Sequence, residues 1–218
     1  MLPLFVAVPL GVGFLLPLIE EFRERTRIFA ITVFLETGLL LALSLVKFGE
    51  KSIYRLGGWP PPLGINYVLD GLSALVLVVI SGIAFVTTLF AMTYMSNYEN
   101  LGKFYGLFSL MLAGMYGVAL TGDVFNMYVY LEVAAISSYA LVGFNRGPEE
   151  IEASFKYLVM GAVGSVFILL GIAMLYGSVG SLNIADISVR VSEVADQSFI
   201  LLSTALFIVG FGLKAAFV

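Results

Sequence analysis

A carboxylate lies inside an apolar run that is long enough to cross a lipid bilayer. The run FNMYVYLEVAAISSYALVGF covers residues 125 to 144, and Glu132 lies near its middle. At about 1.5 Å per helical residue, this places the carboxylate roughly 12 Å inside the hydrocarbon, beyond snorkelling reach of either surface. Burial disfavours the ionised form of a carboxylate and a nearby cation favours it. Glu132 is therefore predicted to gain and lose a proton, as a proton relay requires.

A lysine in another apolar run is the candidate cation. Lys214 lies in IVGFGLKAAFV, where Gly210 and Gly212 precede it. Two glycines this close to a membrane lysine predict a weakened or broken helix, which can open polar backbone towards an ion path. A buried lysine also loses its proton more readily, so it can act as a switchable charge. The alternative is a lysine that reaches the membrane surface from a helix end.

Three further ionisable residues fall within apolar runs. Lys156 follows Glu152 by four residues, so it forms either an ordinary helical ion pair or part of a proton path. Asp70 precedes Gly71 near a predicted helix start, where a capping role is favoured over an ion site. Glu36 lies deep in IFAITVFLETGLLLAL and needs a partner that the sequence does not identify. Glu36 and Asp70 are kept as possible additional charged sites.

The composition places these residues in an integral membrane protein. Of the 218 residues, 60% are hydrophobic, and the mean hydropathy is +1.03. Spanning helices are expected because the apolar runs show no period-2 alternation. The chain contains no cysteine and no histidine. This excludes disulfides and thiol nucleophiles and removes the common zinc and haem ligands, so no catalytic chemistry, metal or other cofactor is expected in this chain. No basic nucleic-acid surface is visible.

Hydropathy predicts an all-α membrane protein with about seven transmembrane helices. The predicted spans are 2–19, 28–48, 67–95, 104–121, 124–144, 152–177 and 199–218. Residues 1–66 are expected to hold the first two helices and a linker rich in Gly and Pro, and residues 67–218 the other five helices. The linker 181–198 is predicted to form a short helix at the membrane interface, with an ordinary solvated loop as the alternative. Its apolar residues at helical spacing are Ile184, Ile187, Val191 and Val194.

The basic residues between the spans give a weak prediction of orientation. Positive charge favours the cytoplasmic face, and the difference between the two faces places the N-terminus outside. The residues on the predicted cytoplasmic face are Arg23, Arg25, Arg27, Lys103 and Arg146, and those on the other face are Lys47, Lys51, Arg55 and Arg190.

Four ordered strings resemble the D-type subunit of the Mrp sodium/proton antiporters, a family related to the antiporter-like subunits of complex I and of membrane-bound hydrogenases. They are GGWPPPLGINYVLDGLSAL, FYGLFSLMLAGMYGVALTGDVFNMYVYLEVAAISSYALV, FKYLVMGAVGSVFILLGIAMLYGSVGSLNIADIS and GFGLKAA. The resemblance covers about residues 57 to 218.

The resemblance implies a subunit of about fourteen helices with two inverted five-helix repeats, each providing a half-channel. The glutamate of the LEV motif falls on Glu132, and the lysine of the GFGLKAA motif falls on Lys214 on a broken seventh helix. The resemblance implies that these two form an ion pair whose making and breaking gates proton movement. Lys156 matches a lysine after the fifth helix less closely, and Asp70 matches the acid of the DGLSA motif.

The resemblance also implies partners and a location. It predicts other membrane subunits of an Mrp-like, complex I-like or hydrogenase complex, protons or sodium as the ions moved, and a bacterial or archaeal cell membrane. Family members continue into a histidine-containing eighth helix, whereas this sequence stops at Val218. It is therefore expected to be a fragment, a split gene product or a short paralogue. The alternative function is a non-conducting structural subunit of such a complex.

Overall fold

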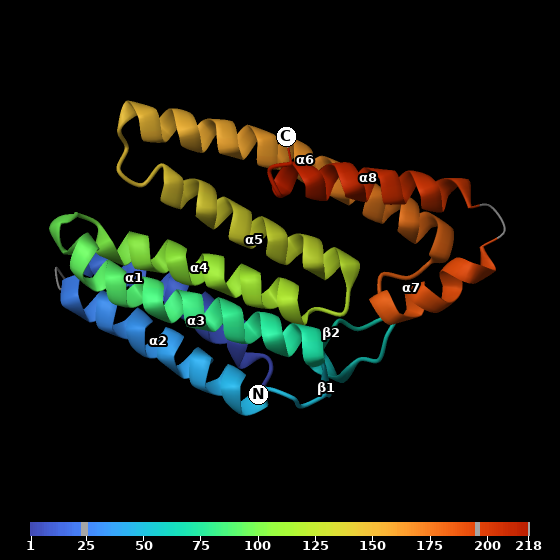
Figure 1. The fold of residues 1–218 in the computed structure, drawn as a ribbon, viewed down its shortest axis with the longest axis horizontal. Helices are drawn as coiled ribbons and strands as arrows, with labels where there is room; N and C mark the ends of the chain where they lie inside the picture. Colours follow the sequence, from blue (N-terminus) through green and yellow to red (C-terminus); the bar gives the residue numbers. More distant parts are fainter. Residues whose placement is uncertain (23–25, 195–196, 218) are drawn as a thin grey trace.

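The computed structural model describes residues 1–22, 26–194 and 197–217 as a bundle of long helices with a small hairpin at one end (Figure 1). Seven long helices account for most of these residues. They are α1 (Leu4–Phe22), α2 (Thr26–Lys47), α3 (Gly71–Tyr94), α4 (Leu101–Leu120), α5 (Val124–Val142), α6 (Pro148–Val179) and α8 (Ser198–Lys214). By length and composition, α2 to α6 can each cross a membrane, and α8 and residues 4–19 of α1 are shorter apolar helices.

Two groups of helices meet along α4 and α5. The helices α1 to α4 share one apolar core, in which Phe5 and Leu40 are fully buried. The helices α6 and α8 pack against each other on the far side of α5 (Figure 1). A Cβ atom added to Gly114 of α4 would lie 2.5 Å from the backbone nitrogen of Ala134 in α5. This close approach fixes the helix that carries Glu132 against the first group.

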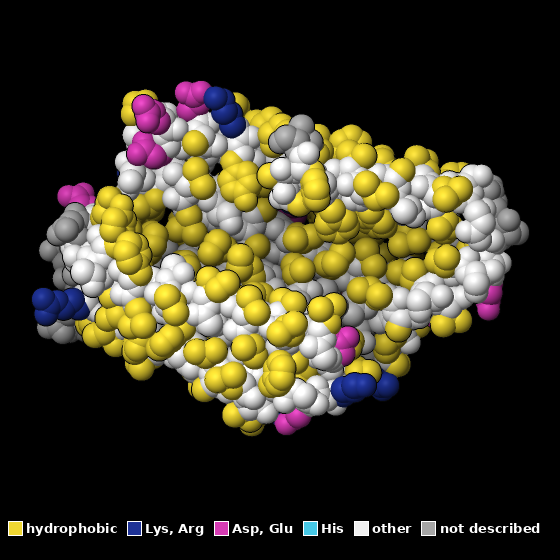
Figure 2. Space-filling model, viewed as in Figure 1, with side chains coloured by type: hydrophobic (Ala, Val, Ile, Leu, Met, Phe, Trp, Pro, Cys, Tyr) yellow, Lys and Arg dark blue, Asp and Glu magenta, His cyan; other side chains and the backbone are white. Residues whose placement is uncertain are grey.

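The outer surface of the bundle is largely apolar on the face shown in Figure 2, as contact with lipid requires. Hydrophobic side chains cover the face in Figure 2, and the charged side chains visible there gather towards its ends. The loops after α3 and α5 lie at one end of the bundle, and those after α2, α4 and α6 lie at the other (Figure 1). The orientation across the membrane stays a prediction, and Arg23 and Arg25, on which it partly depends, lie outside the described residues.

The span predicted for residues 67–95 is wrong over its first residues. Residues Asn66–Leu69 form strand β2, which pairs antiparallel with β1 (Ser52–Arg55), and Ser52 lies opposite Leu69. The apolar run YVL fits a strand as well as a helix, so hydropathy does not separate the two. Asp70 decides the boundary because its carboxylate accepts a hydrogen bond from the Ser73 amide at 2.8 Å, while the Ser73 hydroxyl accepts one from the Asp70 amide. This capping box starts α3.

The linker after α6 contains the predicted short helix. Helix α7 (Ile184–Arg190) is capped by Asn183, whose side chain accepts a hydrogen bond from the Asp186 amide at 3.2 Å. Val191–Glu193 continue as a 3-10 turn. The neighbouring side chains of Ser181, first, and of Arg190 lower the pKa of Asp186. The side chain of Asn183 also donates to that of Asn66 at 2.9 Å, so this linker and the hairpin close the same end of the bundle.

The division into residues 1–66 and 67–218 remains a prediction about sequence organisation.

Candidate functional site

Glu132 and Lys214 form an ion pair between α5 and α8. The Lys214 Nζ lies 2.8 Å from Glu132 Oε1. The exposed fraction of the two side chains is 13% for the lysine and 26% for the glutamate. Both side chains are therefore mostly withdrawn from the surface of this chain, and each supplies the opposite charge that the other needs in an apolar setting.

A serine from a third helix completes the arrangement. The Ser165 hydroxyl of α6 lies 2.5 Å from Glu132 Oε1 and 2.9 Å from the carbonyl oxygen of Gly161. A hydroxyl has one proton, so Ser165 donates to one of these acceptors at a time. Sequence reasoning missed this residue because a serine among small apolar residues reads as helix packing. The only signal is that Ser165 is a polar side chain inside an apolar run, GAVGSVF.

Glycine brings α8 close enough for Lys214 to reach Glu132. A Cβ atom on Gly210 would lie 2.8 Å from the Gly164 carbonyl oxygen, and one on Gly164 would lie 3.0 Å from the Gly210 carbonyl oxygen. The two helices thus pack backbone to backbone at this crossing, one turn before Lys214. Gly210 is therefore a packing residue in a continuous helix, although the sequence suggested that it weakens the helix.

Helix α8 ends directly after the lysine. Ala216 has a positive φ of 56°, a backbone conformation that L-residues other than asparagine and aspartate rarely adopt. The amide of Phe217 donates to the Gly212 carbonyl at 3.0 Å, and that of Ala216 donates to the Leu213 carbonyl at 3.2 Å. These two bonds are the Schellman pattern of a helix terminus. This end of α8 lies against the middle part of α6 (Figure 1), where a Cβ atom on Gly164 would lie 3.3 Å from Lys214 Cγ.

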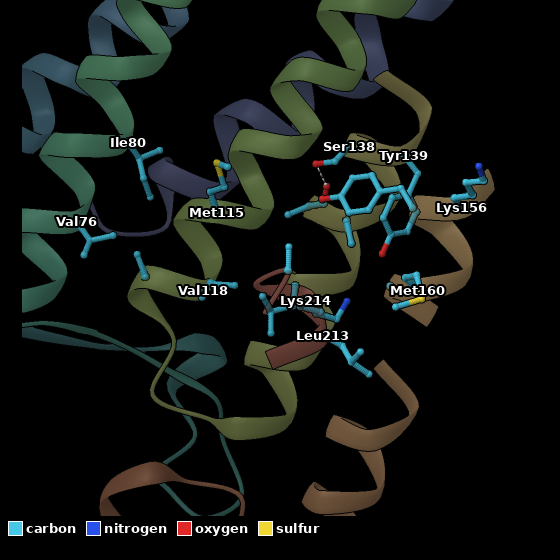
Figure 3. Close-up of a pocket in the computed structure, with 17 residues that line it drawn as sticks. Val76, Ile80, Met115, Val118, Ser138, Tyr139, Lys156, Met160, Leu213 and Lys214 are labelled. Carbon is cyan, nitrogen blue, oxygen red and sulfur yellow. Dashed lines mark hydrogen bonds between the residues drawn. The ribbon is translucent and has the colours of Figure 1, made fainter. Parts of the chain in front are cut away.

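A cavity of about 620 Å³ extends beside the ion pair. Its walls come from α3, α4, α5, α6 and α8, and most of them are apolar, including Val76, Met115 and Leu213 (Figure 3). The polar atoms on its lining belong to Lys214, Lys156 and a small number of hydroxyl-bearing side chains, including Ser138, Tyr139 and Tyr157. The cavity therefore joins the neighbourhood of the ion pair to that of Lys156.

Lys156 itself forms an exposed ion pair. Its Nζ lies 2.5 Å from Glu152 Oε1, and the exposed fractions of the two side chains are 71% and 66%. This is the ordinary helical pair that the spacing allowed, although the lysine also lies on the cavity wall. The structure does not bring Lys156 together with Glu132.

Breaking the Lys156 pair is expected to have little effect on stability. Exposed ion pairs contribute about 0.2–1 kcal/mol, so Lys156→Gln should change the free energy of unfolding by less than about 1 kcal/mol. Glu152→Gln is the matched control because it breaks the same pair from the other side. Thermal unfolding of the purified protein measures both changes. A loss of several kcal/mol in the Lys156 variant alone would show that the lysine has a buried partner.

The other two candidates lie away from the ion pair. Asp70 caps α3, and its hydrogen bonds with Ser73 lower the pKa of its carboxyl group. Glu36 is buried between α2 and α4, with 4% of its surface exposed, and accepts a hydrogen bond from the Ser109 hydroxyl at 2.8 Å. Ser109 is the partner that the sequence could not identify.

Two known family profiles match consecutive parts of the chain. Residues 62–105 match the N-terminal region of chain 5 of complex I, the NADH-ubiquinone oxidoreductase. Residues 121–218 match the transmembrane family of NADH:quinone oxidoreductases and Mrp antiporters. The second match contains both Glu132 and Lys214.

Relatives of both kinds match almost the whole chain. NADH-quinone oxidoreductase subunit N of Desulforudis audaxviator is 36% identical over 99% of this chain, and the match covers 43% of that relative. The D-type subunit of the Na(+)/H(+) antiporter of Alkalihalophilus pseudofirmus is 30% identical over 96% of the chain and 43% of its own length. The chain thus spans less than half the length of these curated relatives.

A solved structure gives the same result for the fold. One chain of the membrane-bound sulfane sulfur reductase, an archaeal respiratory membrane complex, superposes with a TM-score of 0.89 at 33% identity. The superposition covers 97% of this chain and 44% of that chain. Together with the apolar helices, these matches identify a multi-pass membrane protein. This chain belongs to the family of antiporter-like membrane subunits that Mrp antiporters and complex I-type NADH:quinone oxidoreductases share.

Proposed function

We propose that this chain is an ion-translocating subunit of a multisubunit complex in a bacterial or archaeal cell membrane, and that Glu132 and Lys214 carry the switch. The observation that supports this most directly is the ion pair between α5 and α8, at 2.8 Å, beside an open cavity. Two opposite unit charges about 4 Å apart attract by about 4 kcal/mol at an effective dielectric constant near 20. Separation of the pair therefore changes the free energy of the ionised glutamate substantially.

The proposed step is a proton exchange at the Glu132 carboxylate. While the Lys214 ammonium lies next to it, the ionised glutamate is stabilised and its proton is released. When the lysine side chain swings away, the unpaired carboxylate in its apolar setting takes up a proton. The cavity gives the lysine a place to move, since both Lys214 and its neighbour Leu213 line it. Alternation between these two states moves protons, or exchanges them for sodium, without redox chemistry in this chain.

Ser165 is proposed to hold the Glu132 carboxyl group in position. Its hydroxyl can turn from Glu132 Oε1 to the Gly161 carbonyl oxygen without a change in the backbone. The serine can therefore donate to the carboxylate in one state and stay hydrogen-bonded in the other. Lys156 lies on the wall of the same cavity and is the proposed outer member of the path.

The test is ion movement in proteoliposomes that contain the assembled complex. Glu132→Gln keeps the size and polarity of the side chain and removes its proton exchange, so transport should fall to background. Glu193→Gln is the matched control, because this exposed glutamate lies in the turn after α7, outside the cavity lining and the ion pairs of Glu132 and Lys156, and its transport should stay at the wild-type level. Wild-type transport by Glu132→Gln in a fully assembled complex would overturn the proposal and leave a structural, non-conducting role.

A further inference from the structure

A second carboxylate is buried in the group of helices formed by α1 to α4. Glu36 is 4% exposed, and its Oε2 accepts a hydrogen bond from the Ser109 hydroxyl of α4 at 2.8 Å. Its Oε1 is buried and has no hydrogen-bond partner among the residues that the structure describes. Glu36 thus differs from Glu132, which has a lysine beside it.

The charged groups on the helices around Glu36 lie elsewhere or have other partners. On α2 itself, Arg27 and Lys47 are about 13 Å and about 16 Å away along the helix axis. On α4, Lys103 donates to the side chain of Asn100 at 3.2 Å. Residues 71–94 of α3 contain no Asp, Glu, Lys or Arg. The ion pairs formed by the described side chains do not include Glu36.

The remaining titratable neighbours are uncharged or outside the described side chains. Tyr116 of α4 is fully buried, and its hydroxyl is 3.0 Å from the Ser81 hydroxyl. Tyr105 of α4 lies in the same buried core. The acids of α1, Glu20 and Glu21, have side chains outside the described part of the chain. The described surroundings therefore offer Glu36 hydroxyl groups and apolar atoms, with no cation.

A proton is the occupant that these surroundings fit. An ionised carboxylate buried without a cation or a full set of hydrogen bonds is strongly disfavoured, and such a group takes up a proton instead. Hard metal cations need several oxygen ligands, whereas the described partners of Glu36 supply one hydroxyl. In a neutral acid, Oε2 is the carbonyl oxygen that accepts from Ser109, and Oε1 carries the proton.

We propose that Glu36 is a second proton-binding site in this chain, at which the side chain is a neutral carboxylic acid hydrogen-bonded to Ser109. The site lies near the middle of α2, as Glu132 lies near the middle of α5, and α4 contacts both helices. The chain therefore holds two acids at similar depth, one paired with a cation and one kept neutral by its apolar setting. This proposal does not depend on ion transport by the chain.

Infrared spectroscopy of the assembled complex in lipid tests this assignment, with the spectrum of the labelled protein subtracted from that of the unlabelled protein. A protonated carboxyl group has a C=O stretch that is separate from the carboxylate bands, and isotope-labelled glutamate identifies the bands that come from Glu. At neutral pH we expect a protonated-glutamate band that is lost in Glu36→Gln and retained in Glu132→Gln. Ser109→Ala should keep the band and shift it to higher frequency, because the C=O group loses its hydrogen-bond donor.

Three results would overturn the proposal. The first is a wild-type spectrum at neutral pH without a protonated-glutamate band, and the second is a band that persists unchanged in Glu36→Gln. Spectra in sodium chloride and in choline chloride at equal ionic strength supply a third check. Loss of the band on addition of sodium at fixed pH would show a cation site in place of the proton site. If Glu36→Gln does not assemble, the label and Ser109→Ala still decide the assignment. Because the readout is a spectrum, failure of the transport experiment would leave this result unaffected.

Discussion

Adding a single methyl group at Gly210 is expected to push α6 and α8 apart. In Gly210→Ala the new Cβ would lie 2.7 Å from Ile168 Cγ1, 2.8 Å from the Gly164 carbonyl oxygen and 3.0 Å from the Ile168 amide nitrogen. Two of these atoms belong to the backbone of α6, so the clash is relieved only by moving a helix. Overpacking of this kind costs about 1–3 kcal/mol in the free energy of unfolding, and the movement should also separate Lys214 from Glu132.

The same substitution two residues later is the matched control. A Cβ atom on Gly212 would meet no heavy atom within 4 Å. Gly212→Ala should therefore leave the helix contact intact and raise stability by up to about 1 kcal/mol, since alanine favours a helix over glycine. Thermal unfolding of the two variants in detergent compares them directly, and transport should be lost only in Gly210→Ala. A similar stability change of the same sign in both variants would contradict the close helix contact.

Removing the positive charge of Lys214 is expected to destabilise the protein by about 3 kcal/mol, the size of effect seen when one member of a buried ion pair is deleted. Lys214→Met keeps much of the side-chain volume and leaves Glu132 with Ser165 as its described hydrogen-bond donor. The cost arises because Glu132 loses the cation that stabilises its ionised form, so the carboxylate must stay ionised in an apolar setting or take up a proton.

Adding Glu132→Gln to Lys214→Met should recover part of the lost stability. The double variant has neither charge, so no unpaired charge remains. Unfolding of the wild type, the two single variants and the double variant gives a coupling free energy, which we expect to be about 1–3 kcal/mol. Additive single effects would show that the two charges do not stabilise each other. Lys156→Gln with Glu152→Gln provides the corresponding cycle for an exposed pair, where the coupling should be below about 1 kcal/mol.

Hydropathy predicted the helices well because long apolar runs carry a strong signal. The predicted spans 28–48 and 124–144 differ by two residues or fewer at each end from α2 and α5. The hairpin was missed because its second strand, Asn66–Leu69, is an apolar segment that adjoins a helix of the same composition. Strand β2 is separated from helix α3 by the capping box of Asp70 and by its pairing with Ser52–Arg55. Pairing with a segment elsewhere in the chain cannot be detected from local hydropathy.

The sequence predicted only some residues of the candidate site. Burial singled out Glu132, and the glycines before Lys214 suggested a partner, which the structure places at 2.8 Å. Neither Ser165 nor Ser109 could be predicted, because a serine in an apolar helix usually bonds its own backbone. Their partners lie on other helices, 33 and 73 residues away in the chain. Such partners are fixed by helix packing, which spacing along one helix cannot reveal.

The end of α8 at Lys214 gives the lysine a second electrostatic partner. The peptide dipoles of a helix add up to a partial charge of about −0.5 at its C-terminus. Because α8 ends against the middle part of α6, this partial charge lies inside the bundle, on the helix turn that carries Lys214 (Figure 1). In the proposed proton exchange, a protonated Glu132 is neutral, whereas the partial charge of the helix terminus stays. The helix terminus would then be the fixed counter-charge of Lys214, and Glu132 the counter-charge that we propose to switch.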